Sequence, residues 1–459
     1  MKVRRVLVLG AIVACTTPAA PPIEAPEPAP VPTETRPPVE RSTPPATRPP
    51  VDTSPPTVLH SPVHGARGGS GGIDVGEETI RVMLSDDESA VHISSPAAFQ
   101  FTNAAGSLAA RAGRNQSWRV ERNGHRVRAL RPDGVGTLWS DGPLVARAPS
   151  AALLSVDGKP YRGDVVFFGG DSGVVVVNVV RIDDYLRGVV PLEIGARAPA
   201  ESAAVQAQAI TARSYAYTHL ESGASREYDV TDGTLDQEYG GVAAESAVSS
   251  QAVESTRTLV LRYAGRVVNA PYHSTCGGST AEASEVWHSA DEPYLQRVSD
   301  RIPGTNRYYC DISPRFTWTR TLDATTLDAA LSRYLATYAT VPGQRPGIAE
   351  GVTIGSHTAS GRVGTVTFTT SRGNFVVRGN DIRFVLRAPG GEILNSTYFS
   401  VEQTLAPDGS LSRVTIHGMG YGHGVGMCQW GAIGRARAGQ NFRTILHTYY
   451  PGTTVGPAR

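Results

Sequence analysis

An excess of either sign of charge is missing from this chain. Its 459 residues include 43 Lys and Arg against 42 Asp and Glu, which leaves a formal net charge of +1 at pH 7. The part expected to fold carries no block of basic residues, so no nucleic-acid partner is predicted. Neither a phosphate-binding P-loop nor a Ser-His-Asp pattern is present in the sequence, and those two kinds of chemistry are therefore not suggested.

Long apolar runs are missing as well. The apolar stretch at residues 6–13 follows three basic residues among the first five, an order typical of an export signal. A bilayer-spanning helix needs roughly 20 apolar residues, so this stretch does not predict one. The sequence IVAC at residues 12–15 fits a lipobox. We predict a signal peptide over residues 1–15 and an exported protein anchored to a membrane by lipid on Cys15, facing the periplasm or cell wall. An ordinary secretory signal with an incidental cysteine is the alternative.

Proline is concentrated in one segment. About half of the 33 prolines fall between residues 18 and 62. Such a composition cannot bury a core, so residues 16–72 are predicted to be a disordered linker with polyproline II character. At roughly 3.1 Å per residue, a linker of this kind reaches on the order of 150 Å, which suits a tether.

The rest of the chain predicts an α+β fold. Residues 73–459 exceed the ~250–300 at which single cores usually divide, so we expect two or three packed subdomains forming a cleft. Residues 73–180 are β-rich, and Asp157-Gly158 between short apolar runs predicts a hairpin. Further along, a strand is predicted to end at residues 188–191. Helices are predicted from near Ala200 and over 243–255, 326–338, 432–438 and 442–449, with a hairpin at 259–268 and further β structure over 352–385.

Glycine is dense in one C-terminal run, GMGYGHGVGMCQWG at residues 418–431, which holds six glycines. Glycine loses the most backbone entropy on folding, so such density is typical of backbone that approaches something closely or adopts positive φ. The run also carries Tyr421, His423 and Gln429, whose polar tips have little bulk around them. We interpret it as the floor of a binding cleft; a tight turn between two core elements is the alternative.

This run, with HTYYPGT at 447–453, resembles the closing motif of the SpoIID/LytB family, the stage II sporulation protein D and amidase-enhancer group. Two further stretches are similar to motifs of that family in the same order: YLRGVVPLEI at 185–194 with AVQAQAITARSYA at 204–216, and YHSTCGGST at 272–280. The resemblance covers about residues 82–455. It implies a catalytic core over 181–455, preceded by the β-rich part and carrying an inserted α/β segment at about 321–400.

Glu193 is the candidate catalytic residue. It lies between Leu192 and Ile194 after an apolar stretch, and a carboxyl in apolar surroundings has a raised pKa. A surface glutamate at a strand end is the alternative that the residues alone leave open. The resemblance implies that Glu193 is the acid/base of a lytic transglycosylase that cleaves peptide-stripped peptidoglycan glycan strands without a required cofactor. It also implies an alternative, a non-catalytic wall-binding protein that recruits an N-acetylmuramoyl-L-alanine amidase.

Other predicted site residues surround these motifs. Arg213 reaches either a carbohydrate carboxylate or a core acid, and the polar loop at 228–241 contributes either sugar contacts or caps. His423 is expected to orient Glu193 or to bind a sugar hydroxyl. The predicted substrate-binding residues are Arg213, Tyr215, Gln237, Tyr239, His273, Ser274, Tyr421, His423 and Gln429, with Asp232 as a further sugar contact.

Cysteine is scarce, with four in the chain. If Cys15 is lipidated, three remain, an odd number that predicts either one disulfide with a free thiol or a metal site. A disulfide between Cys276 and Cys310 is predicted for an oxidising compartment. The resemblance implies the alternative, a structural zinc held by His273 and Cys276. Four ligands are needed for such a site, and the candidates to complete it are Cys310, His288 and Cys428.

Overall fold

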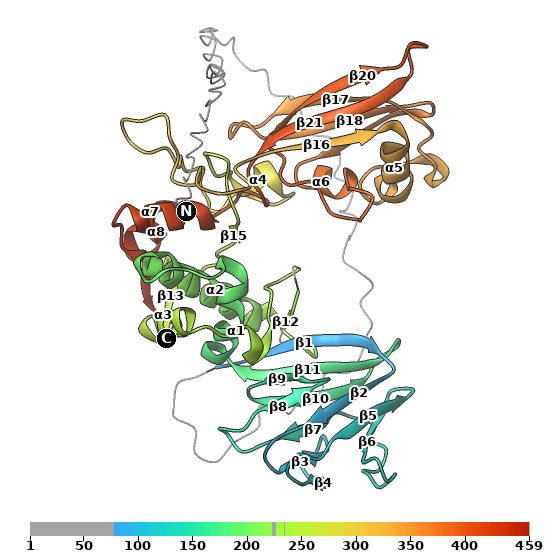
Figure 1. The fold of residues 1–459 in the computed structure, drawn as a ribbon, viewed down its shortest axis with the longest axis vertical. Coiled ribbons are helices and arrows are strands. Elements are labelled where there is room, and N and C mark those ends of the chain that lie inside the picture. The colour runs from blue at the N-terminus through green and yellow to red at the C-terminus, as the bar shows by residue number, and fades with distance from the viewer. Residues whose placement is uncertain (1–77, 223–225, 234, 459) are drawn as a thin grey trace, which may run out of the picture. The chain divides into compact units, whose positions relative to one another are not determined.

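The computed structural model describes residues 78–222, 226–233 and 235–458 (Figure 1). The predicted signal peptide, Cys15 and the linker at 16–72 lie outside these residues. The structure is 25% helix and 35% strand, arranged as several sheets with helices, which confirms the predicted α+β class. In the part of the chain that is described, no helix has both the length and the apolar character to cross a membrane. The cleft between subdomains stays a prediction.

Two sheets make up the β-rich part. The first has the spatial order β12 (Val230–Thr231), β1 (Thr79–Glu88), β11 (Val174–Arg181), β10 (Asp164–Gly169), β7 (Leu144–Arg147), β3 (Phe99–Thr102) and β4 (Leu108–Ala112). The second has the order β6 (Arg126–Leu130), β5 (Trp118–Asn123), β2 (Ala90–Ser94), β8 (Leu154–Val156) and β9 (Lys159–Tyr161). Strand β11 pairs on both sides, and its consecutive valines are buried because the strand lies inside the sheet. The predicted hairpin is confirmed between β8 and β9, where Asp157 (φ 45°) and Gly158 (φ 84°) form the turn.

Helix α1 (Ile182–Ile194) corrects the prediction of a strand end at 188–191. Its buried apolar residues recur at helical spacing, namely Ile182, Tyr185, Leu186, Val189 and Val190. Gly188 lets the helix approach the following loop, because a Cβ there would lie 2.7 Å from the Tyr239 ring. Glu193 is therefore in the last turn of a buried helix rather than at the end of a strand.

Helix α2 (Ser202–Ser222) begins where the sequence predicts, after a 3₁₀ turn at Pro199–Glu201. Its stripe of small buried residues includes Ala204, Ala209 and Ala212, which allows other helices to pack closely. Helix α2 contacts α1, α3, α7 and α8 (Figure 1). The bounds of these partners are Ala247–Ser255 for α3, Gln429–Arg437 for α7 and Phe442–Tyr449 for α8. The predicted helices at 432–438 and 442–449 are thus confirmed, and the one at 243–255 is a 3₁₀ turn (Gly241–Ala244) followed by α3.

Short strands connect this helical region. The predicted hairpin at 259–268 is confirmed as β13 (Leu259–Tyr263) and β14 (Arg266–Val267), with β23 (Thr454–Pro457) on the other side of β13. Strand β15 (Tyr272–His273) pairs in parallel with β22 (Met427–Cys428), so two of the motifs lie side by side. A short helix α4 (Ala283–Val286) follows.

A second hydrophobic core is drawn from residues between Leu322 and Ile416. Its sheets have the orders β16 (Thr317–Asp323), β21 (Leu411–Met419), β20 (Phe399–Leu405) and β17 (Ala349–His357), β18 (Val363–Thr370), β19 (Gly373–Arg378). Helices α5 (Ala324–Tyr338) and α6 (Asp381–Val385) and a 3₁₀ turn (Pro342–Gln344) accompany them. The prediction of a helix at 326–338 is confirmed. The prediction of β structure over 352–385 is correct for β17, β18 and β19 and wrong at α6.

Candidate active site

The glycine-rich run turns closely around the 271–276 segment. Gly420, Gly422, Gly424 and Gly426 all have positive φ, between 70° and 110°, which L-residues with a Cβ rarely adopt. At Gly426 a Cβ would also lie 2.0 Å from the carbonyl oxygen of Pro271. The run therefore needs glycine both for its backbone conformation and for its close approach to strand β15.

Glu193 is a carboxyl with a strongly shifted pKa. Burial raises its pKa from 4.5 to about 7, because the charged form loses hydration. The backbone N–H of Glu238 donates to Oε1 of Glu193 at 3.1 Å and opposes part of this rise. The charge of the Glu238 side chain acts in the other direction and raises the pKa further. A carboxyl with these properties is half protonated near neutral pH.

A ring of polar side chains holds the Glu193 carboxyl. Tyr272 and Gln429 both hydrogen-bond to it, and each bond favours the ionised form. Buried Gln237 donates from Nε2 to the Tyr272 hydroxyl at 2.9 Å, so the Tyr272 proton is left to point to Glu193. Gln429 in turn donates to buried Gln208 at 3.3 Å. The structure thus brings the predicted residues Gln237 and Gln429 together with Glu193.

The two histidines support this ring without touching Glu193. Nε2 of His423 donates to the carbonyl oxygen of Tyr272 at 2.8 Å, and the backbone N–H of Val425 donates to its Nδ1 at 3.1 Å. Burial lowers the pKa of His423 to about 3. His273 is 4% exposed and contacts the carbonyl oxygen of Val425 through Nδ1 at 3.1 Å, and burial lowers its pKa well below the usual value. Both rings are therefore neutral, and His423 positions the backbone that carries Tyr272.

Three further predicted residues, Tyr215, Tyr421 and Ser274, have contacts with groups other than Glu193. The Tyr215 hydroxyl donates to Oδ1 of Asp236 at 2.9 Å, and the ionised Glu193 contributes to raising its pKa. Arg315 lies over the Tyr421 ring at 4.1 Å. The Ser274 carbonyl oxygen accepts from the backbone N–H of Trp430 at 3.0 Å, so this residue joins the two motifs through its backbone.

Two predicted substrate contacts are structural, which corrects the prediction. Arg213 is 1% exposed, pairs with Asp183 at 2.8 Å and donates to backbone carbonyls. Tyr239 is 5% exposed and donates to Asn178 at 2.8 Å between other aromatic rings. Asp232 lies where burial raises its pKa and Lys159 opposes the rise, and its backbone pairs with Met83 and Tyr239. Arg213 and Tyr239 therefore stabilise the core instead of facing a ligand, whereas the sugar contact by Asp232 stays a prediction.

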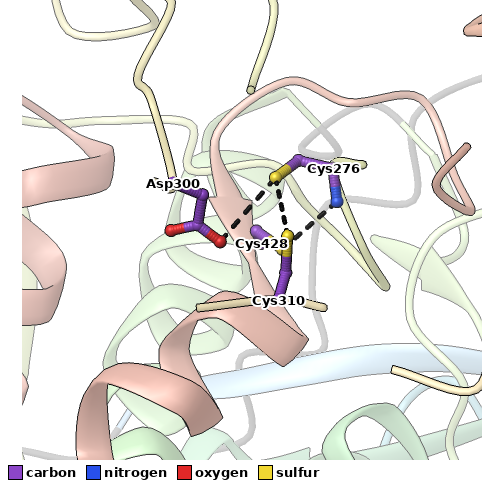
Figure 2. A group of neighbouring side chains, drawn as sticks. All are labelled: Cys276, Asp300, Cys310 and Cys428. Atoms are coloured by element: carbon purple, nitrogen blue, oxygen red, sulfur yellow. Dashed lines mark hydrogen bonds between the residues drawn. The ribbon is translucent and has the colours of Figure 1, made fainter. Parts of the chain in front are cut away.

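The cysteines do not form the predicted disulfide. All three cysteines in the described residues are free and buried, and the sulfurs of Cys276 and Cys310 are 3.5 Å apart, well beyond a bonded pair at about 2.05 Å. Cys428 and Asp300 complete a compact group with them (Figure 2). His273 is not in this group, so the predicted His273–Cys276 ligand pair is corrected as well.

Sequence reasoning missed Tyr272, Gln208 and Asp300. Tyr272 lies in the motif at 272–280 and Gln208 in the motif at 204–216. The only sequence signal for either residue is a polar side chain among apolar or small neighbours. Asp300 lies in a loop outside the motifs and carries no local pattern, so only the fold brings it to the cysteines.

The structure defines an α+β protein with a half-buried, protonatable carboxylate in a polar ring formed by three separate sequence motifs. The model of the family described as Stage II sporulation protein matches residues 170–263, and a model described as a domain of unknown function matches 305–426. An uncharacterised protein of Brachyspira hyodysenteriae is 31% identical over 66% of this chain and 74% of its own length. The amidase enhancer of Bacillus subtilis is 33% identical over 66% of this chain and 45% of its own length. The stage II sporulation protein D of Bacillus subtilis is 28% identical over 61% and 76%.

The chain belongs to the family of the stage II sporulation protein D and the amidase enhancer. Of the amidase enhancer it spans less than half the length.

Proposed function

We propose that this protein is a lytic transglycosylase that cleaves peptide-stripped peptidoglycan glycan strands in cell-wall remodelling. The observation that carries the proposal is the raised pKa of Glu193, to about 7, inside a ring of hydrogen-bonding side chains. An acid of this pKa donates and accepts a proton readily near neutral pH.

The proposed reaction uses one carboxyl twice. Protonated Glu193 gives its proton to the glycosidic oxygen as the C1–O4 bond breaks. The sugar's own O6 hydroxyl then attacks C1, and the Glu193 carboxylate takes the O6 proton, which restores the acid. The product carries a 1,6-anhydro ring, no water is consumed, and neither a cofactor nor a second carboxylate is required.

A non-catalytic role is the second candidate, because one relative is named an amidase enhancer. In this case the same polar ring binds glycan and an N-acetylmuramoyl-L-alanine amidase supplies the cleavage. Lipidation of Cys15 and anchoring to a membrane belong to either proposal and stay predictions.

Product analysis separates the two candidates. The full chain is incubated with amidase-treated, peptide-free glycan strands and with intact sacculi, in water enriched in oxygen-18. Mass spectrometry is expected to find unlabelled 1,6-anhydro-muramic ends from the peptide-free strands. Labelled reducing ends would indicate hydrolysis instead, and glycan retained without any cleavage would favour the enhancer role.

Replacing Tyr272 with Phe is expected to move the pH profile of cleavage to higher pH. The Tyr272 hydroxyl favours ionised Glu193, so without it the pKa of Glu193 rises and the acid keeps its proton to higher pH. Replacing Glu238 with Gln is the control of opposite sign, because it removes a charge that raises the pKa of Glu193. Rates measured from pH 5 to 9 in both variants check this pair, and a common direction of shift would contradict the assignment.

A further inference from the structure

Four buried ligand groups converge beside the polar ring. The side chains of Cys276, Asp300, Cys310 and Cys428 are all buried, and one ligand atom of each lies within 4.8 Å of the others (Figure 2). They come from separate segments of the chain. Cys428 lies in strand β22, and Cys276 follows strand β15, which pairs with β22. Three cysteines and one carboxylate brought this close together are a ligand set typical of a transition-metal site.

The spacing fits a tetrahedral metal better than a disulfide. The Cys276 sulfur lies 3.5 Å from the Cys310 sulfur and 3.8 Å from Oδ2 of Asp300. Around a tetrahedral zinc with bonds of about 2.3 Å to sulfur, two ligand sulfurs stand about 3.8 Å apart. A disulfide requires about 2.05 Å.

The surroundings of Asp300 orient it as a ligand. Its Oδ1 accepts from the Tyr449 hydroxyl at 2.7 Å and from Arg435 at 2.9 Å. The other oxygen, Oδ2, is left toward the sulfurs. Gly431 makes room for this arrangement, because a Cβ there would lie 2.3 Å from Oδ2 of Asp300. Hydrogen bonds that fix one carboxylate oxygen while the other binds metal are the usual outer support of a metal site.

Backbone donors and positively charged side chains lie close to the sulfurs. Cys428 Sγ accepts from the backbone N–H groups of Cys276 and Gly431, each at 3.2 Å, and so lies at the N-terminus of helix α7. Arg435 beside Asp300 and fully buried Arg362, which donates to the Cys276 carbonyl oxygen at 2.9 Å, add positive charge. Together with a divalent ion, the two guanidiniums balance three thiolates and one carboxylate.

We propose that Cys276, Cys310, Cys428 and Asp300 bind one structural zinc ion. Three sulfur ligands select zinc over the hard cations magnesium and calcium, and four protein ligands leave no open position for substrate. The ion joins the 272–276 and 427–429 segments, which carry Tyr272 and Gln429 to Glu193, to the loop that contains Cys310. This role does not depend on whether the polar ring catalyses cleavage or only binds glycan.

Metal content and spectroscopy test the proposal without an activity assay. Full-chain protein purified under reducing conditions is expected to hold close to one zinc per chain by mass spectrometry of the elements. After exchange with cobalt(II), a sulfur-to-cobalt charge-transfer band is expected in the near ultraviolet. Tyr449→Phe removes only the hydroxyl bonded to Asp300, so it is expected to keep the fold and to bind zinc about 10–100-fold more weakly in chelator competition. Cys310→Ser is expected to lose the band.

Control variants address the rival ligands. His273→Gln and His288→Gln are expected to retain one zinc and the unchanged cobalt spectrum. Loss of metal in His273→Gln together with retention in Cys310→Ser would overturn the ligand assignment. Metal-free wild-type protein, or a Cys276–Cys310 disulfide found by peptide mapping of protein purified without reductant or chelator, would overturn the site itself. The zinc content of the wild-type protein tests the proposal without any variant. The proposal can therefore be refuted even if a variant fails to fold.

Discussion

Glu193→Gln is expected to lower the rate of anhydro-product formation by about 10²–10⁴-fold, the usual contribution of a general acid. The amide has nearly the same shape as the carboxylic acid but neither protonates the glycosidic oxygen nor takes the O6 proton. Rates of product release from peptide-free strands, measured by mass spectrometry for both proteins, check this expectation. Wild-type cleavage is expected to fall as the pH rises through about 7, where Glu193 loses its proton.

Stability distinguishes loss of chemistry from loss of fold. Because the pKa of Glu193 is raised to about 7, the folded protein holds this proton after the unfolded chain has lost it. Ionisation of Glu193 therefore has no effect on stability below the unfolded pKa, and it lowers stability progressively as the pH rises to about 7, by about 1–3 kcal/mol. Glu193→Gln is expected to unfold at an equal or higher denaturant concentration than the wild type at pH 8. Full cleavage by this variant would exclude Glu193 as the acid, and equal glycan binding by both proteins without cleavage would support the enhancer role.

From the sequence, the segments that form the site could be predicted more accurately than the secondary structure of those segments. The motifs at 185–194, 272–280 and 418–431 do meet around one carboxyl, and the expected positive φ of the glycine run is present. The prediction of a strand end before Glu193 was wrong. Runs such as Gly-Val-Val-Pro are short and contain β-branched residues, so their hydrophobic period fits a strand or a helix equally well. Only the longer pattern from Ile182 to Val190 reveals the helix.

The contacts that buried polar side chains make were the part of the site that the sequence predicted least well. Whether a polar residue on a motif faces the core or a ligand depends on packing from distant segments, as for Tyr239 against Asn178. The choice between a disulfide and a metal site depends on a few ångströms between Cys276 and Cys310 and on the arrival of Asp300 from a loop. Residue spacing along the chain predicts neither the distance between the two sulfurs nor the position of Asp300.

Arg213→Met is expected to lower the free energy of unfolding by about 3–5 kcal/mol, the usual loss when one partner of a buried ion pair is removed. The methionine fills much of the same volume, but Asp183 loses its closer arginine partner, at 2.8 Å. The backbone carbonyls of residues 253, 256 and 259 lose their donor inside the core. Urea unfolding of the variant and the wild type measures the difference.

Arg257→Met is the matched control for this change. Arg257 approaches the same Asp183, at 3.6 Å, but its side chain is 43% exposed, and exposed pairs contribute about 0–1 kcal/mol. Since Arg213 is 1% exposed, glycan affinity is expected to be the same in Arg213→Met and wild type under conditions where both are folded. A small loss of stability combined with a tenfold loss of glycan affinity would instead assign Arg213 to a sugar carboxylate. The two arginines share one carboxylate, but only Arg213 is buried and also donates to backbone carbonyls. The comparison therefore measures how much the buried ion pair and its hydrogen bonds contribute beyond an exposed contact with the same carboxylate.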